Sequence, residues 1–304
     1  MPPSQAINGE PSSKRQRPNV GSALKKPPAP SYDQGLAYWD GIEASVDGVL
    51  GGFGNGPVPH VDQLSSRLLL LSLIPSLGTF PNPLTPSPPP TPSHRLTALD
   101  VGAGIGRVSR HVLLPLFEDV ITVEPVGKFI DEGYRQGRDR EWADLQRQKE
   151  SGRGKRVWFV KGGLQTLDPR YPAKNGEVVG VVGEARGGDT VAFGEAEAEV
   201  VYDAIWCQWC LGHMSTPDLI TFFKKAQSAL RDNTESFVFV KENCCDDAPG
   251  GTGQEFLDEE DSSLTRSHQK WLDIFKEAGL EVVREEVQEG LPDELFVVKT
   301  WALR

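Results

Sequence analysis

The chain has 304 residues, 38% of them hydrophobic and 25% charged, with a formal net charge of −11 at pH 7. It can bury a substantial core in one or two domains, and its negative charge disfavours direct binding of nucleic acid and favours a basic peptide as partner. It has no apolar run long enough to span a membrane and no signal peptide, and four cysteines are typical of a reducing compartment, so we expect a cytoplasmic protein.

Three stretches of biased composition divide the chain. Residues 1–30 are rich in Pro, Ser and Lys/Arg and predict a disordered basic tail. The run Lys14–Arg17 is either a solvated tail or a nuclear-import signal, which would add a nuclear location. A Pro-rich insertion is expected at 75–95 and a Gly/Glu-rich surface insertion at 168–199, within a single domain over 31–304.

The remaining segments alternate between strand and helix patterns, which predicts an α/β fold with a parallel sheet. The strands are expected at 97–101, 120–124, 157–161, 200–207 and 237–241, and the helices at 107–117, 127–137, 217–231 and 263–278. Pro115 should end or kink the first helix, Thr216 should cap the third and Gly279 should end the last. Two strands at 280–287 and 295–302 predict a closing antiparallel hairpin, which makes seven strands in all.

The segment Leu99–Arg107 predicts a ligand site at the end of the first strand. Glycines at 102, 104 and 106 remove side chains from the turn, so its backbone amides can approach a ligand at a helix N-terminus. The third glycine comes one residue too early for a dinucleotide fingerprint, with Arg107 in its place. This spacing resembles the nucleoside-binding turn of S-adenosylmethionine methyltransferases, and Glu124, at the end of the next strand, could accept both ribose hydroxyls.

Six blocks of sequence resemble the family of alpha-N-terminal protein methyltransferases. They are YWDGIEASVDGVLGGFG (38–54), LDVGAGIGRVSRHVLLPLF (99–117), IWCQWCLGHM (205–214), FVKENCC (239–245), LDEEDSSLTR (257–266) and LPDELF (291–296). The first and third blocks are the most specific, because the wider superfamily lacks them. The resemblance implies a seven-stranded, Rossmann-like class I methyltransferase sheet, with helices from 38–70 covering the cofactor.

The resemblance implies S-adenosyl-L-methionine as cofactor. Arg107 would pair with the methionyl carboxylate, and Leu164 and Gln165 would bracket the adenine, although Leu164 alone could equally be a packing residue. Glu124 stands where the family usually has Asp. The residues implied in cofactor binding are Gly102, Arg107, Glu124, Pro125, Val126, Leu164, Gln165 and Gln208.

The resemblance also implies a substrate: the free α-amine of proteins that begin X-Pro-Lys after loss of methionine, such as basic ribosomal or chromatin proteins. Asp261 and His213 match the proposed bases, and Asn243 matches the residue that binds the substrate N-terminus. Without the resemblance, Trp209 would be assigned to the core and the acidic run 258–261 to a solvated surface. The residues implied in peptide binding are Trp39, Leu50, Gly51, Trp209, Asp258 and Ser263.

Some features leave alternatives open. Phe296 replaces a common Tyr of the family, so a hydroxyl contact to the peptide is absent there. Cys207 and Cys210 form a C-x-x-C pair near Cys244 and Cys245, but the spacing is unusual for zinc and we expect no metal site. Two other functions remain open. The chain could be a methyltransferase that acts on a small molecule or another protein atom, or a non-catalytic binder of adenosylmethionine. We expect a monomer.

Overall fold

A computed structural model describes residues 27–78, 92–146, 152–186, 195, 197–232 and 234–304. The tail predicted for 1–30 and the insertion predicted for 75–95 lie mostly outside these residues, so their predicted character is untested. In the part of the chain that the structure describes, no helix combines the length and the apolar character needed to cross a bilayer.

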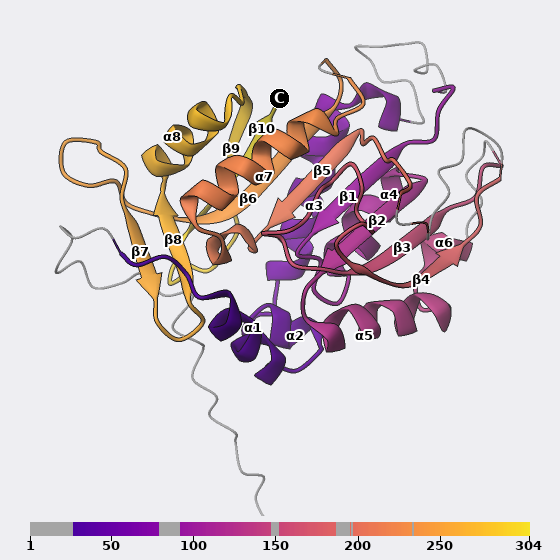
Figure 1. The fold of residues 1–304 in the computed structure, drawn as a ribbon, viewed down its shortest axis with the longest axis horizontal. Helices are drawn as coiled ribbons and strands as arrows, with labels where there is room; N and C mark the ends of the chain where they lie inside the picture. Colours follow the sequence, from indigo (N-terminus) through magenta and orange to yellow (C-terminus); the bar gives the residue numbers. More distant parts are fainter. Residues whose placement is uncertain (1–26, 79–91, 147–151, 187–194, 196, 233) are drawn as a thin grey trace, which may run out of the picture.

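One sheet joins strands from Thr97 to Leu303, in the order β4-β3-β2-β1-β5-β6-β10-β9 (Figure 1). Five central strands run parallel, as predicted: β1 (Thr97–Val101), β2 (Asp119–Glu124), β3 (Arg156–Lys161), β5 (Ala204–Gln208) and β6 (Phe237–Cys245). The predicted hairpin is formed by β9 (Val282–Val287) and β10 (Val297–Leu303), with β10 antiparallel to both β9 and β6.

Three strands add to the seven that were predicted. β4 (Glu177–Gly183) lies antiparallel to β3 at the sheet edge, within the expected insertion at 168–199. β7 (Glu255–Asp258) and β8 (Ser263–Ser267) form a second hairpin, and the end of β8 pairs with β6. The first five residues of the helix predicted for 263–278 are therefore a strand. Leu264 and Arg266 are buried at alternate positions, which is the period of a strand. The helical pattern begins only after these residues.

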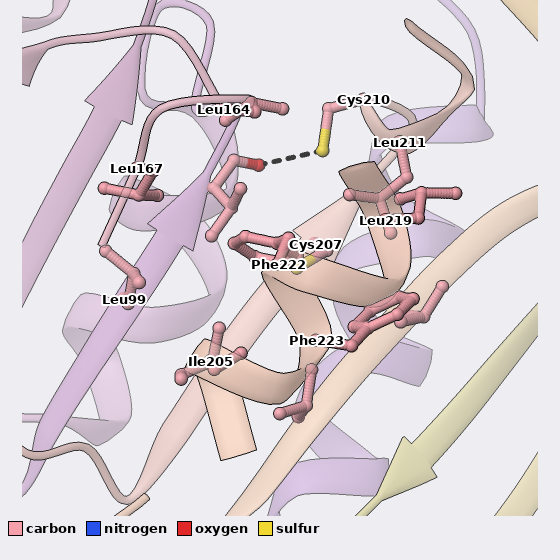
Figure 2. Packing of buried hydrophobic residues seen from close by; sticks show 14 of the residues in the cluster. Leu99, Leu164, Leu167, Ile205, Cys207, Cys210, Leu211, Leu219, Phe222 and Phe223 are labelled. Atoms are coloured by element: carbon pink, nitrogen blue, oxygen red, sulfur yellow. Dashed lines mark hydrogen bonds between the residues drawn. The ribbon is translucent and has the colours of Figure 1, made fainter. Parts of the chain in front are cut away.

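Helices cover both faces of the sheet. α7 (Thr216–Ser228) and α8 (His268–Ala278) pack on one face, where Phe222, Phe223 and Ile205 share a buried cluster (Figures 1 and 2). The opposite face is covered by α3 (Val58–Leu73), η3 (Ser109–Leu113), α4 (Leu114–Leu116), α5 (Gly127–Arg138) and α6 (Ala143–Gln146). Successive residues of the central strands alternate between the two clusters, so both faces of the sheet are buried.

Two helix boundaries differ from those predicted. Ser215, not Thr216, is the cap of α7, and its hydroxyl accepts the N–H of Asp218. The first predicted helix begins at Arg107, widens into a π-helical turn and ends at Leu116, which confirms the expected effect of Pro115. Because Pro115 has no N–H for the carbonyl of His111, that carbonyl instead accepts the Nε–H of Arg67 from α3 at 2.6 Å.

The N-terminal segment forms the predicted helical cover. α1 (Tyr32–Gly41) and α2 (Val46–Val49) lie together, next to the loops that follow the parallel strands (Figure 1). The backbone N–H of Ser31 donates to the hydroxyl of Ser262 at 2.7 Å, and the side-chain amide of Gln34 donates to the backbone carbonyl of Glu259. These bonds tie the start of α1 to the turn between β7 and β8. A 3-10 turn, η2 (Pro75–Leu77), follows α3.

Candidate active site

A cavity opens at the carboxyl ends of β1, β2 and β5, beneath α1. Its empty volume is about 1050 Å³, the open mouth included, which is ample for a small-molecule ligand. It is lined by Tyr32, Gly35, Leu36, Trp39, Val49, Leu50, Asp100, Gly102, Ala103, Gly104, Arg107, Val108, Glu124, Pro125, Val126, Phe129, Leu164, Gln165, Gln208, Trp209, Cys210, His213 and Met214. The predicted ligand site at the glycine turn therefore lies on a real cavity.

The glycine turn has the backbone shape that the sequence indicated. Gly102, Gly104 and Gly106 have φ values of +67°, +57° and +80°, in the left-handed region that other residues rarely adopt. A Cβ at Gly102 would come within 2.4 Å of the Cβ of Cys210. Glycine is therefore needed both for the conformation and for the close approach of the loop after β5.

Glu124 closes the turn against the next loop. One carboxylate oxygen accepts the N–H of Gly104 and the other accepts the N–H of Val126, both at 2.8 Å. Burial raises the pKa of Glu124 to about 7, against the lowering effect of these two bonds. A carboxylate has about four acceptor positions, so Glu124 can still accept hydroxyl groups from a ligand.

Asp62 of α3 organises a buried charged network that the sequence did not reveal. Its Oδ2 lies 2.5 Å from the guanidinium of Arg107. Its Oδ1 lies 2.6 Å from the ammonium of Lys241 and accepts the side-chain amide N–H of Gln208 at 2.8 Å. Burial alone would raise the pKa of Asp62, but Arg107 and Lys241 outweigh it and lower this pKa below its ordinary value. The signal was present in the helix pattern, since Val58, Asp62, Ser66 and Leu69 share one buried face.

His213 and Trp39 meet across the cavity. The indole N–H of Trp39 donates to Nε2 of His213 at 2.9 Å, and the same nitrogen lies 3.7 Å from Oδ2 of Asp261. A nitrogen that accepts a hydrogen bond carries no proton, so the Trp39 bond places the proton of a neutral His213 on Nδ1. Asp261 is buried, and its other oxygen accepts the N–H and hydroxyl of Ser263.

The loop after β5 is held by groups beneath the cavity. Trp209 has a φ of +54°, an uncommon conformation for a large side chain. The next two N–H groups, of Cys210 and Leu211, both donate to Oε1 of Glu242, at 3.0 and 2.9 Å. Arg266 donates to the carbonyls of Leu211 and Met214. Glu242 and Arg266 were not predicted, because their partners lie about 30 and 50 positions away.

All residues predicted to bind the cofactor line this one cavity: Gly102, Arg107, Glu124, Pro125, Val126, Leu164, Gln165 and Gln208. So do four of the remaining predicted site residues: Trp39, Leu50, Trp209 and His213. The others lie outside its lining, Asp261 and Ser263 directly behind His213 and Asn243 on β6 opposite Val298 of β10. Gly51 and Asp258 are likewise outside it. The individual roles of all these residues stay predictions.

The four cysteines are buried free thiols. Burial raises the pKa of Cys207 and Cys210 well above the ordinary value, which favours the unreactive thiol form. The thiol of Cys210 donates to the carbonyl of Val101 at 3.1 Å and so joins the glycine turn to the loop after β5 (Figure 2). No cluster of three or more metal-binding side chains occurs among the described residues.

A family model described as AdoMet dependent proline di-methyltransferase matches residues 28–170 and 193–304 of this chain. Alpha N-terminal protein methyltransferase 1 of Arabidopsis thaliana is 32% identical over 94% of this chain and 84% of its own length. N-terminal Xaa-Pro-Lys N-methyltransferase 1 of Rattus norvegicus is 30% identical over 90% of this chain and 95% of its own.

Solved structures share the fold. A SAM-dependent methyltransferase from Leishmania major superposes with a TM-score of 0.62 at 30% identity, over 90% of this chain and 82% of that one. A 1,6-didemethyltoxoflavin N1-methyltransferase from Burkholderia thailandensis has a TM-score of 0.53 at 15% identity, over 95% of this chain and 98% of that one, and supports the fold alone.

Proposed function

Because the chain belongs to the family of AdoMet-dependent proline di-methyltransferases, we propose that it methylates the free α-amine of proteins that begin X-Pro-Lys. It is a methyltransferase of the Rossmann-like class, and its cofactor is S-adenosylmethionine. One observation carries the proposal about the substrate. A single cavity is lined by the predicted cofactor residues, by Trp39 and Trp209, which match peptide-binding positions of that family, and by His213, which matches a proposed base.

The residues of the cavity fit this cofactor. Arg107 lines the cavity, and its guanidinium suits the carboxylate of a methionyl group. Glu124 retains acceptor positions for ribose hydroxyls, and the apolar side chains of Leu164 and Val126 suit a base. When bound, S-adenosylmethionine supplies an electrophilic methyl group on a sulfonium centre.

The protein must present the substrate amine as a free base. An α-amino group has a pKa of about 7.7–8.0, so most of it is protonated at pH 7 and has no lone pair to attack with. As the new N–C bond forms, the amine must also lose a proton. We assign this proton to the pair formed by Asp261 and His213, whose Nε2 can take it only once the N–H of Trp39 has moved off that nitrogen. Trp39 and Trp209 provide flat walls for the proline and the methylated cation.

The charge of the chain supports a basic partner. The third residue of the substrate, Lys, would meet Asp258, and exposed acids of the same turn and of α1 extend the negative surface. Basic ribosomal or chromatin proteins have this character. We place the protein in the cytoplasm, with a nuclear fraction through its basic N-terminal run, and propose that it acts as a monomer.

The proposal is tested with purified protein, labelled S-adenosylmethionine and a peptide that begins Ser-Pro-Lys. We expect label on the α-amine, with the number of methyl groups read by mass spectrometry. The same peptide with an acetylated amine is the matched control and should stay unlabelled. A Ser-Pro-Lys peptide that remains unmodified while the protein binds the cofactor would overturn the proposed substrate.

Two variants separate the predicted roles of the site residues. Asp261→Asn and Asn243→Ala should lower the methylation rate by tenfold or more, since each removes a group assigned to the substrate amine. Neither group lines the cofactor cavity, so the Kd for S-adenosylhomocysteine, measured by calorimetry, should change less than threefold. An equal loss of both would contradict the assignment.

A further inference from the structure

Lys241 is a buried cation that the proposed chemistry does not use. Its side chain is 1% exposed and does not line the cavity. It lies on β6 and contacts the same carboxylate that Arg107 contacts from the cavity side. A lysine in such a position is costly unless it is paired and hydrogen-bonded.

The contacts of Lys241 are complete. Its ammonium lies 2.6 Å from Oδ1 of Asp62 and donates to the hydroxyls of Ser66 and Ser65 at 3.1 and 3.3 Å. Arg107 takes the other oxygen of Asp62, at 2.5 Å, and Gln208 shares Oδ1 with Lys241. The single negative charge of Asp62 therefore interacts with two positive charges and one side-chain amide.

Other charged groups act on this network at longer range. Burial raises the pKa of Asp100 to about 6, and its attraction to Arg107 opposes this rise. Glu286 of β9 opposes the loss of the Lys241 proton. Burial lowers the pKa of Lys241, and Asp62 opposes this effect. Within ion-pair distance, the described residues leave the network with one positive charge more than Asp62 can neutralise.

We propose that Lys241 is a positioning residue for the cofactor carboxylate, acting through Asp62. If Asp62 had Arg107 as its only cationic partner, the pair would be neutral, and a ligand carboxylate would meet an arginine whose charge is already balanced. Because Lys241 draws on the same carboxylate, Arg107 keeps an unbalanced charge toward the cavity. Asp62 at the same time orients Arg107, at the start of the helix after β1, and Gln208, at the end of β5.

The experiment compares two ligands that differ in one group. S-adenosylhomocysteine carries the carboxylate, and its decarboxylated analogue, S-adenosyl-3-thiopropylamine, lacks it. In Lys241→Met we expect the affinity for S-adenosylhomocysteine to fall about tenfold, with little change for the analogue. Lys224→Met, on the exposed surface of α7, removes the same charge far from the network and should change neither affinity.

A second variant restores the charge. In the double variant Asp62→Asn/Lys241→Met, Arg107 is the one charge left of the three, and the Asn oxygen can still accept from Arg107. The preference for the carboxylate should return to within about threefold of wild type. Equal losses for both ligands in Lys241→Met, or no recovery in the double variant, would show that Lys241 only supports the fold.

The wild-type protein provides a check that needs no substitution. Because the pKa of Lys241 is lowered by burial, its charge is lost at a lower pH than that of an ordinary lysine. The ratio of the two affinities should therefore fall as the pH is raised through the alkaline range, once each affinity has been corrected for the ionisation of its own ligand amine, because the two amines differ in pKa. A ratio that stays constant up to the pH at which the protein unfolds would contradict the proposal.

Discussion

Three buried carboxyl groups, two in the lining of the cavity and one outside it, bond the backbone of the segments around it. Asp100 accepts the N–H and hydroxyl of Ser109, Glu124 accepts two N–H groups across the glycine turn, and Glu242 accepts two N–H groups of the loop after β5. Burial raises their pKa values to about 6, about 7 and about 7. The geometry of the site is thus maintained at a cost in stability whenever these groups are ionised.

Glu242 offers a direct measure of that cost. Its folded pKa of about 7 exceeds the ordinary value of 4.5, so between these values the folded state binds more protons, and stability falls as the pH rises. Glu242→Gln keeps an acceptor oxygen and carries no charge. At pH 8 we expect it to be about 3 kcal/mol more stable than wild type in urea unfolding, and at pH 5 by no more than about 1 kcal/mol.

The control is Glu289→Gln, an exposed residue for which no difference is expected at either pH. Arg266 keeps its ion pair with Glu255 at 3.3 Å in the Glu242 variant, so no buried cation loses its only partner. A Glu242 variant that is less stable than wild type at pH 8 would show that the charge of Glu242 stabilises the fold.

At the level of elements, the N-terminal helices belong to the site as much as the sheet does. α1 contributes Trp39 to the cavity, and α3 contributes Asp62 to the network below it. The start of α1 is bonded to the turn between β7 and β8, and the hydroxyl of Tyr32 donates to Asp218 at the start of α7. Segments about 190 to 230 positions apart in sequence therefore meet at the mouth of the cavity.

The start of α7 allows a test of a single cap. Ser215→Ala removes the hydroxyl that accepts the N–H of Asp218, and the free energy of unfolding should fall by about 1 kcal/mol. Thr216→Ala is the matched control, because the buried hydroxyl of Thr216 has no hydrogen-bond partner among the described residues, and its removal should cost little. The free energy of unfolding of both variants is measured by chemical denaturation. A larger loss in Thr216→Ala than in Ser215→Ala would show that Thr216 is the cap.

On the scale of the whole molecule, a net charge of −11 surrounds a cavity whose floor is positive. The outer acids are exposed on α1 and on the turn after β7, where Asp33, Glu259 and Glu260 lie. Such an arrangement attracts a cationic peptide at long range and leaves the local binding of the cofactor to the buried network.

This arrangement predicts a dependence on salt. For an X-Pro-Lys peptide with further lysines after the third residue, KM should rise threefold or more between about 25 and 300 mM salt, because exposed charges are screened beyond a Debye length of roughly 5–20 Å in that range. The kcat should change little. A peptide of equal length with neutral residues after the lysine should show a weaker dependence in the same steady-state assay, and equal dependences would contradict the long-range attraction.

Features that depend on residues close together in the chain could be predicted from the sequence. The five parallel strands, the closing hairpin and the effect of Pro115 follow from apolar periodicity and from the chemistry of proline. The glycine turn and Glu124 follow from residue types at fixed spacing. These patterns are local, so they can be read without knowing which segments meet.

Which side chains far apart in the sequence bind the same partner could be seen only in the folded structure. Asp62 meets Gln208 and Lys241 across 146 and 179 positions of sequence, and no spacing rule connects them. The strand at Ser263–Ser267 was mistaken for helix because its partners on β6 and β7 are set by the packing of Leu264 and Arg266. Burial also decided the protonation of Glu124 and Glu242, because the cost of ionising a carboxyl depends on the low dielectric around it, which exists only once the chain has folded.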